Sequence, residues 1–393
     1  MIPVFRPSID DDEINAVTDA MRSGWIGLGP RTAEFEERFA AFCGVPHAVG
    51  LNSGTAALDL AMRLLEIGEG DEVVVPTMTF VSTAHVVALN RATPVFADSD
   101  PVTLNIDPND VARKITPRTR AVIVTHYSGR PVDLNLVAAA APGLPIIEDC
   151  AHAAGATFQG APVGGIGVIG CFSFHAVKNL SSGEGGMLTT RNAAWAKRAH
   201  SLRWLGIDRS TWKRAQSAAG YRWRYSVTEL GLKCHMNDIA AAMGLVQLRR
   251  LAELNARRRS LVSRYRAGLS GIAELSLPPQ DDETFRSSWH LFCIQCERRD
   301  ALGAYLAEHG VGTGVHYIPI HTHECYGRQP PLPVAEDLGE RILTLPLYPD
   351  LQGSDVDRIT GLIQGFYRAD RGDRPAPPRP SYRIPGTHPP RAS

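Results

Sequence analysis

One lysine, Lys178, lies in a nearly uncharged run of small, hydroxyl-bearing and aromatic residues between positions 170 and 186, GCFSFHAVKNLSSGEGG. Small and apolar neighbours remove water from an ammonium group and lower its pKa. The neutral amine that results is a nucleophile, and it can condense with a carbonyl. A surface lysine in a glycine-rich loop is the alternative, and the lysine considered alone leaves both interpretations open.

Two acids follow an apolar run a little upstream, in the sequence PIIED at 145–149. An acid at the end of a buried strand needs a partner, and a protonated ring nitrogen is one candidate. A reactive lysine together with such an acid indicates pyridoxal phosphate (PLP). In this interpretation Lys178 forms the Schiff base, and Asp149 faces the pyridinium nitrogen.

A Ser-Gly-Thr turn, Ser53-Gly54-Thr55, lies between an expected strand at 47–51 and an expected helix. The free backbone N–H groups of a helix N-terminus, together with nearby hydroxyls, can bind a phosphate group. Gly54 would let the backbone approach the anion closely. A plain helix N-cap is the alternative, because any helix can begin this way.

The elements that must position these residues alternate between short apolar runs and helical segments. We expect strands near 47–51, 73–75, 93–97, 121–125, 144–147 and 171–174. This alternation predicts a mostly parallel sheet covered by helices on both faces. Ligands bind beyond the carboxyl ends of the strands in such sheets. Residues 53–55, Phe80, Asp149 and Ser173 all fall there.

The length of 393 residues predicts two domains, a large one at 1–250 and a smaller α/β domain at 251–370. Residues 371–393 are rich in proline and are expected to form a disordered tail.

Lysine plus arginine and aspartate plus glutamate both number 41, so no net charge attracts nucleic acid. No apolar stretch is long enough for a membrane span. Seven cysteines without a CxxC pair indicate reduced thiols in a cytoplasmic protein.

Three further segments could contact a substrate. The sequence HYIPIHTH at 316–323 holds His316, Tyr317 and His321; Pro319 breaks the spacing expected of a metal site, so we expect no metal, and substrate contact or domain packing instead. The sequence GWIGLGP at 24–30 holds Trp25, Gly27 and Leu28, in either a ligand-binding or a packed loop. Residues 191–228 interleave aromatic residues with arginines, which suits a base and a diphosphate, or packing against a partner subunit.

The order of the motifs resembles the DegT/DnrJ/StrS family of PLP-dependent sugar aminotransferases. The motifs are NSGTAAL at 52–58, TF at 79–80, EDCAHA at 148–153, FSFHAVKN at 172–179 and GEGG at 183–186. The similarity also includes GWIGLGP at 24–30, MNDI at 236–239, HYIP at 316–319 and LPLYP at 345–349.

The resemblance implies the fold of aspartate aminotransferase (fold type I) and a homodimer with active sites at the interface. It implies that Lys178 carries the internal aldimine, that Asp149 pairs with the pyridine nitrogen, and that His152 lies near the phenolic oxygen. It implies further that Phe80 stacks on the ring. The phosphate contacts it implies are Ser53, Gly54, Thr55 and Ser173.

One segment departs from the family pattern. Members carry an Asn before the long helix that reaches the neighbouring subunit's phosphate, whereas this chain has GLKCHM at 231–236. Lys233 or His235 is expected to take that role. The resemblance implies amino transfer from an amino acid, expected to be glutamate, to a keto sugar, expected to be a nucleotide-linked 4-keto-6-deoxy sugar. A 3-keto sugar, a ketocyclitol and a regulatory PLP-binding protein without turnover are the alternatives.

Overall fold

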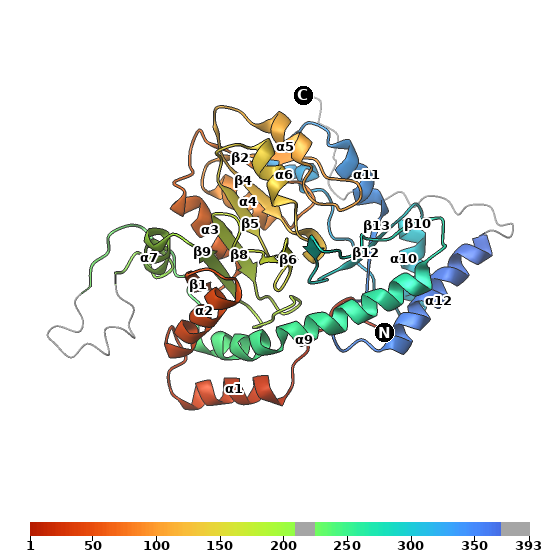
Figure 1. The fold of residues 1–393 in the computed structure, drawn as a ribbon, viewed down its shortest axis with the longest axis horizontal. Helices are drawn as coiled ribbons and strands as arrows, with labels where there is room; N and C mark the ends of the chain where they lie inside the picture. Colours follow the sequence, from red (N-terminus) through yellow and green to blue (C-terminus); the bar gives the residue numbers. More distant parts are fainter. Residues whose placement is uncertain (209–224, 371–393) are drawn as a thin grey trace, which may run out of the picture.

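The computed structural model describes residues 1–208 and 225–370 (Figure 1). The helices are α1 Asp11–Arg22, α2 Pro30–Phe42, α3 Gly54–Leu64, α4 Ser82–Leu89, α5 Pro108–Lys114, α6 Leu134–Ala140, α7 Ala193–Leu202, α9 Asp238–Leu269, α10 Arg299–Glu308, α11 Pro333–Arg341 and α12 Gly353–Asp370. The strands are β1 His47–Leu51, β2 Glu72–Pro76, β3 Thr93–Ala97, β4 Thr119–Thr125, β5 Ile146–Asp149, β6 Thr157–Phe158, β7 Ala161–Pro162, β8 Ile169–Ser173, β9 Gly186–Thr190, β10 Leu275–Ser276, β11 Phe285–Arg286, β12 Phe292–Cys296 and β13 Ile342–Leu345.

A seven-stranded sheet with the order β1-β9-β8-β5-β4-β2-β3 forms the centre of the molecule. The neighbouring pairs from β8 to β3 are all parallel, and β9 runs antiparallel to both of its neighbours. The predicted mostly parallel sheet is therefore confirmed. Its order also explains the position of the site, because β2, β4, β5 and β8 deliver their carboxyl ends to one edge.

Alternate residues of the central strands face two different cores. Val73 and Val75 of β2 pack in the core that includes α3 and α4, whereas Val74 packs in the core that includes α5 and α6. Successive side chains of a strand point to opposite faces, so a strand buried on both faces must be apolar throughout. The run of valines in β2 meets that requirement, and helices cover both faces as expected.

A second sheet, β10-β12-β13, is antiparallel and belongs to the C-terminal part of the chain. The long helix α9 connects the two parts: it packs against α1 and α2 near its start and against α12 near its end (Figure 1). The predicted domain boundary between residues 250 and 251 lies inside this uninterrupted helix. The division into two domains stays a prediction.

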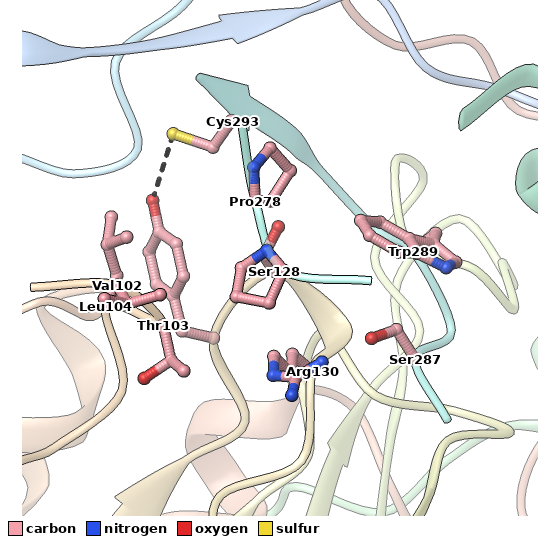
Figure 2. Close-up of a pocket in the computed structure, with 11 residues that line it drawn as sticks. Val102, Thr103, Leu104, Ser128, Arg130, Pro278, Ser287, Trp289 and Cys293 are labelled. Carbon is pink, nitrogen blue, oxygen red and sulfur yellow. Dashed lines mark hydrogen bonds between the residues drawn. The ribbon is translucent and has the colours of Figure 1, made fainter. Parts of the chain in front are cut away.

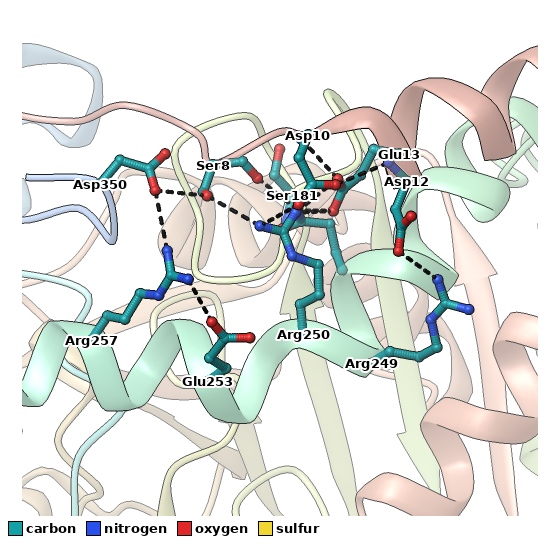
Figure 3. A network of polar contacts seen from close by, with 11 residues as sticks. Ser8, Asp10, Asp12, Glu13, Ser181, Arg249, Arg250, Glu253, Arg257 and Asp350 are labelled. Carbon is teal, nitrogen blue, oxygen red and sulfur yellow. Dashed lines mark hydrogen bonds and ion pairs between the residues drawn. The ribbon is translucent and has the colours of Figure 1, made fainter.

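Polar contacts centred on the buried Glu13 fasten the N-terminal segment to α9 (Figure 3). Arg250 donates to both carboxylate oxygens of Glu13, at 2.6 and 2.7 Å, and pairs with Asp10 at 2.9 Å. Gln247 donates to Glu13 at 2.7 Å and accepts from the backbone N–H of Ser181 at 3.3 Å. Ser181 belongs to the loop that carries Lys178, so this network connects α1 with that loop.

Several expectations concern residues that the structure does not describe. The predicted tail at 371–393 and residues 209–224 of the arginine- and aromatic-rich segment at 191–228 lie outside the described residues. Within the described part, no helix is both long and apolar enough to cross a membrane. The seven cysteines, all of them in that part, are free thiols, and only Cys325 is exposed.

Candidate active site

A cavity of about 400 Å³ lies at the carboxyl edge of the central sheet. Its volume is within the range of small-molecule sites. Its lining includes most of the cofactor residues predicted from the sequence. The lining residues are Ser53, Gly54, Thr55, Leu58, Thr79, Phe80, Ser82, Thr125, Asp149, Ala151, His152, Ser173, His175, Val177, Lys178, Glu184, His316 and Tyr317.

Lys178 lies in the loop between β8 and β9. Burial lowers the pKa of its ammonium group to about 8, although the negative charge of Asp149 opposes the shift. A substantial share of the side chain is therefore the neutral amine near pH 8. This is the condition that the sequence predicted for a carbonyl-reactive lysine.

The next residue, Asn179, fixes the lysine loop from outside the cavity. Its side-chain amide donates to Asn255 of α9 at 2.9 Å and to the carbonyl oxygen of Ser288 at 2.7 Å. Both amide protons are then in use, so the carbonyl oxygen of Asn179 accepts from His290, at 3.1 Å. The position of Lys178 thus depends on elements far apart in the sequence.

The two acids at the end of β5 serve different faces of the sheet. Asp149 lines the cavity. Glu148 points away from it and is bound by His126 and by backbone N–H groups that include those of Gly164 and Gly167. Burial by itself would raise the pKa of Glu148, but these donors outweigh burial and keep that pKa below its ordinary value. Glu148 is therefore a structural anchor, and Asp149 is the acid available to a ligand.

Asp149 is almost completely buried and accepts two hydrogen bonds. The Thr83 hydroxyl donates to Oδ2 at 2.8 Å, and the backbone N–H of Ala151 donates to Oδ1 at 3.1 Å. Burial raises the pKa of Asp149, whereas these donors and the Lys178 ammonium lower it. Thr83 is not among the residues predicted from the sequence. Thr83 lies four residues after Thr79, on the first turn of the helix that follows Phe80. This spacing is the only feature of the sequence that indicates a shared role for the two threonines.

The Ser-Gly-Thr turn meets β8 at very close range. Ser53 is the N-cap of α3, where its hydroxyl accepts from the backbone N–H of Ala56. A side-chain Cβ at Gly54 would lie 2.9 Å from the Cβ of Ser173, so only glycine permits this approach. The hydroxyls of Thr55 and Ser173 are the further donors beside the helix N-terminus. Such a site suits a phosphate group.

His152 carries a buried ring nitrogen that has no protein partner. Its Nε2 is 2.9 Å from the Tyr317 hydroxyl, and its Nδ1 is buried without a hydrogen bond within the described chain. Burial, together with the charge of Lys178, keeps the pKa of His152 well below its ordinary value, so the ring is neutral. Burial also lowers the pKa of the nearby His316 to about 4. Both histidines are thus uncharged at neutral pH.

Phe80 is 55% exposed although it lines the cavity, and its ring lies 6.0 Å from that of Tyr317. An exposed aromatic face beside a cavity suits a planar ring. The residues present therefore fit PLP in four respects: an amine nucleophile, a carboxylate, a helix N-terminus with hydroxyls, and the unpartnered Nδ1 of His152.

The structure does not bring all predicted residues into this cavity. Trp25, Gly27 and Leu28 lie in the loop before α2, whose Gly27 carbonyl accepts from the backbone N–H of Asp238. His321 is buried between Thr77, at 2.6 Å, and Glu336, at 3.2 Å. The predicted substrate contacts of these four residues stay predictions.

Lys233 and His235 also lie outside the cavity lining of their own chain. Lys233 is exposed, and its ammonium lies 5.7 Å from the ring of Trp204. His235 packs edge-on against the same ring, and burial lowers its pKa to about 4. Their predicted contact with a partner subunit's phosphate stays a prediction.

A second, much smaller cavity lies between the segments 102–104, 127–130 and 278–293 (Figure 2). It measures about 20 Å³, which is room for about one water molecule. The Tyr127 hydroxyl closes one side by hydrogen bonds to Cys293 and to the carbonyl oxygen of His316. This space is too small for a substrate. The cavity of about 400 Å³ is the candidate active site because Lys178 and Asp149 line it.

The fold and the site define an aminotransferase of fold type I. Its features are a lysine amine and a buried carboxylate at the carboxyl edge of a mostly parallel sheet, beside a smaller C-terminal sheet. The sequence pattern of the DegT/DnrJ/EryC1/StrS aminotransferase family matches residues 7–364, and the chain belongs to this family. The resemblance found in the sequence motifs is confirmed.

Individual relatives agree with this assignment. The spore coat polysaccharide biosynthesis protein SpsC from Bacillus subtilis (strain 168) is 41% identical over 381 residues, which is 93% of this chain and 97% of SpsC. The aminotransferase TlmJ from Streptoalloteichus hindustanus is 39% identical with a TM-score of 0.89, over 95% of this chain and 100% of TlmJ. The PLP form of Spr1654 from Streptococcus pneumoniae, to which a sugar aminotransferase activity is attributed, is 33% identical with a TM-score of 0.87, over 94% and 99% of the two chains.

Proposed function

We propose that this aminotransferase uses PLP to move an amino group from an amino acid, glutamate, to a keto sugar. The observation that carries the proposal is the placement of Lys178 and Asp149 in one cavity, with the pKa of the lysine lowered to about 8. The helix N-terminus at Ser53 and the unpartnered Nδ1 of His152 support the proposal, because they would contact the phosphate group and the phenolic oxygen of PLP.

When bound, PLP would supply a carbonyl that condenses with amines and a ring that accepts electrons as a substrate carbon loses its proton. Lys178 would hold the cofactor covalently through Nζ. As a free amine, Nζ would take up the proton that leaves the Cα of the amino acid. The Asp149 carboxylate would keep a proton on the ring nitrogen, and Gly54, Thr55 and Ser173 would hold the phosphate group.

The names of the relatives support a sugar as the acceptor. SpsC is named for polysaccharide biosynthesis, and Spr1654 for a sugar aminotransferase activity. Within that class we propose a nucleotide-linked 4-keto-6-deoxy sugar, because the segment KCHMND at 233–238 is closer to that of 4-aminotransferases than to the pattern common in 3-aminotransferases. A 3-keto sugar or a ketocyclitol is the second candidate.

We also propose a homodimer in which each subunit completes the other's site. The exposed Lys233 and the half-buried His235 lie on a segment of this chain outside its own cavity, which is the arrangement such a role requires. A regulatory protein without turnover is disfavoured, since Lys178, Asp149 and Ser173 are all present and all line the cavity.

The test is to incubate the purified protein with PLP, glutamate and a panel of nucleotide-linked keto sugars, and to detect amino sugars by mass spectrometry. We expect transfer to a 4-keto-6-deoxy sugar by the wild type. Lys178→Ala should show none, whereas Lys197→Ala, which changes an exposed lysine on α7, should retain full transfer. A wild type that aminates no sugar in the panel would contradict the proposal.

A further inference from the structure

Three threonine hydroxyls form a continuous chain that ends on Asp149. Thr83 Oγ1 lies 2.8 Å from Oδ2 of Asp149, Thr79 Oγ1 lies 3.0 Å from that of Thr83, and Thr125 Oγ1 lies 3.0 Å from that of Thr79. All three threonines are buried. A hydroxyl has one proton to donate, so the donor in each hydrogen bond is fixed once the donor in the neighbouring bond is known.

When Asp149 is ionised, the donor of every hydrogen bond in the chain is fixed. A carboxylate only accepts, so the Thr83 proton must go to Asp149. Thr83 then has no proton left for Thr79, so Thr79 donates to Thr83. By the same argument Thr125 donates to Thr79. Every hydroxyl dipole of the chain therefore points its positive end towards the carboxylate.

The sheet order creates this chain. Thr125 ends β4, where it is paired in register with Asp149 at the end of β5, and Thr79 follows the neighbouring strand β2. Thr83 lies on the first full turn of α4. Three consecutive strands of the sheet thus contribute their carboxyl ends to one polar cluster.

Other groups face Asp149 from the elements packed around it. Lys178 approaches from the β8–β9 loop and His126 from the end of β4, and both favour the ionised carboxylate. Burial raises the pKa values of Tyr317 and of the Cys171 thiol, and the nearby Asp149 charge raises both further. Burial is the largest of these influences and leaves the pKa of Asp149 above its ordinary value, while the hydrogen bonds and the two charges limit the rise.

We propose that Thr83, Thr79 and Thr125 are positioning residues for the aminotransferase reaction: their one-way chain of hydrogen bonds holds the Asp149 carboxylate in place and keeps it ionised. Hydrogen-bond chains polarise each member in turn, so the effect of each hydroxyl falls with its distance from the acid. The catalytic consequence rests on the proposed role of Asp149 towards the PLP ring nitrogen, but the ionisation of Asp149 itself can be measured without PLP.

The test uses the cofactor-free protein and infrared difference spectra between high and low pH. The band of the protonated Asp149 carboxyl group is the one that Asp149→Asn removes, and its titration gives the pKa. We expect Thr83→Val, which removes the hydroxyl with little change of shape, to raise that pKa by about 1 to 2 units. Thr79→Val should raise it by about 0.3 unit, and Thr125→Val by less.

Two controls separate this role from a purely structural one. Thr83→Ser keeps the hydroxyl and should restore the wild-type pKa. Thr77→Val removes a hydroxyl that is equally buried but is bonded to His321, and it should leave the Asp149 pKa unchanged. Circular dichroism reports folding. If Thr83→Val does not fold, the proposal is tested by comparing the Asp149 pKa of Thr79→Val with that of Thr125→Val, and the larger increase is expected in Thr79→Val.

An unchanged pKa in folded Thr83→Val, or equal values for Thr83→Val and Thr83→Ser, would overturn the proposal. So would a larger shift in Thr125→Val than in Thr79→Val. These outcomes do not depend on the sugar or the cofactor. A protein that shows the predicted pKa series but transfers no amino group would contradict the proposed function and leave the hydroxyl chain in place.

Discussion

At the scale of single residues, the site depends on the balance between burial and charge at Lys178 and Asp149. Each group is shifted by burial towards its neutral form, and each opposes the shift in the other. An amine that is substantially neutral near pH 8 can act as a nucleophile, and a carboxylate kept ionised can hold a proton on a ring nitrogen. The pair thus combines a base and an acid partner in one cavity.

The lowered pKa of Lys178 predicts how the cofactor-free protein captures a carbonyl compound. The capture rate should rise with pH and level off above a midpoint near 8, because deprotonation exposes the amine. Stopped-flow absorbance with pyridoxal phosphate measures the rate. Asp149→Asn removes the charge that raises the lysine pKa, so its midpoint should lie below that of the wild type. A midpoint above 9, or no shift in the variant, would contradict this explanation.

Residue chemistry and the family resemblance together predicted Lys178, Asp149, Phe80, His152, Ser173 and residues 53–55, and all of them line one cavity. They did not predict Thr83 or Thr125, because their role arises from the adjacency of β2, β4 and β5. His321 illustrates the opposite case. It is close to His316 in the sequence, but a short turn directs it to Thr77 and Glu336.

At the scale of elements, the strands and helices were predictable where apolar runs were short and clearly bounded. The expected strands at 47–51 and 93–97 agree with β1 and β3. Strand β5 differs, since it includes Glu148 and Asp149, which the apolar run alone had excluded. Hydrogen bonds from His126 and the 164–167 loop offset the free-energy cost of burying the Glu148 carboxylate, so the strand can continue through this residue.

The contact between α3 and β8 predicts the effect of a single methyl group. Gly54→Ala would place a Cβ 2.9 Å from the Cβ of Ser173, so α3 and β8 must separate at the Ser-Gly-Thr turn. Overpacking of this kind costs about 1 to 3 kcal/mol, which would weaken PLP binding by about 5- to 150-fold. Gly68→Ala, where the nearest atom is 3.8 Å from the new Cβ, is the matched control. Equal dissociation constants for the two variants, measured by fluorescence titration, would refute the argument.

The link between α1 and α9 predicts a stability difference between two neighbouring acids. Glu13 is 1% exposed and bound to Arg250 and Gln247, so Glu13→Ala should lower the free energy of unfolding by about 2 to 3 kcal/mol. Asp12 pairs with Arg249 on the surface, and Asp12→Ala should cost less than about 1 kcal/mol. Urea denaturation followed by tryptophan fluorescence compares them. The reverse order would show that the network does not hold the N-terminal segment.

At the scale of the whole molecule, exposed apolar residues gather beside the segment expected to reach a partner. Leu230 is 90% exposed, and Leu205, Val227 and Leu232 are also exposed. Val227, Leu230 and Leu232 are close in the sequence to Lys233 and His235, and the backbone N–H of Leu205 donates to the carbonyl oxygen of Leu232 at 3.0 Å. Large exposed apolar groups gathered in this way favour an interface there.

We therefore expect a homodimer in size-exclusion chromatography with light scattering. Leu230→Asp should shift the protein towards monomers and lower its activity, whereas Leu136→Asp, which changes an exposed residue of α6, should do neither. A wild-type monomer that is fully active would contradict the dimeric site.

The most direct test of the central claim, that Lys178 holds the cofactor, is chemical trapping. The protein is loaded with PLP, reduced with borohydride, digested, and analysed by mass spectrometry. The chain has four other lysines that compete as controls: Lys114, Lys197, Lys213 and Lys233. We predict a phosphopyridoxyl group on the peptide that contains Lys178 and its absence from the Lys178→Ala variant. A stoichiometric label on another lysine, or no label on Lys178, would contradict the account.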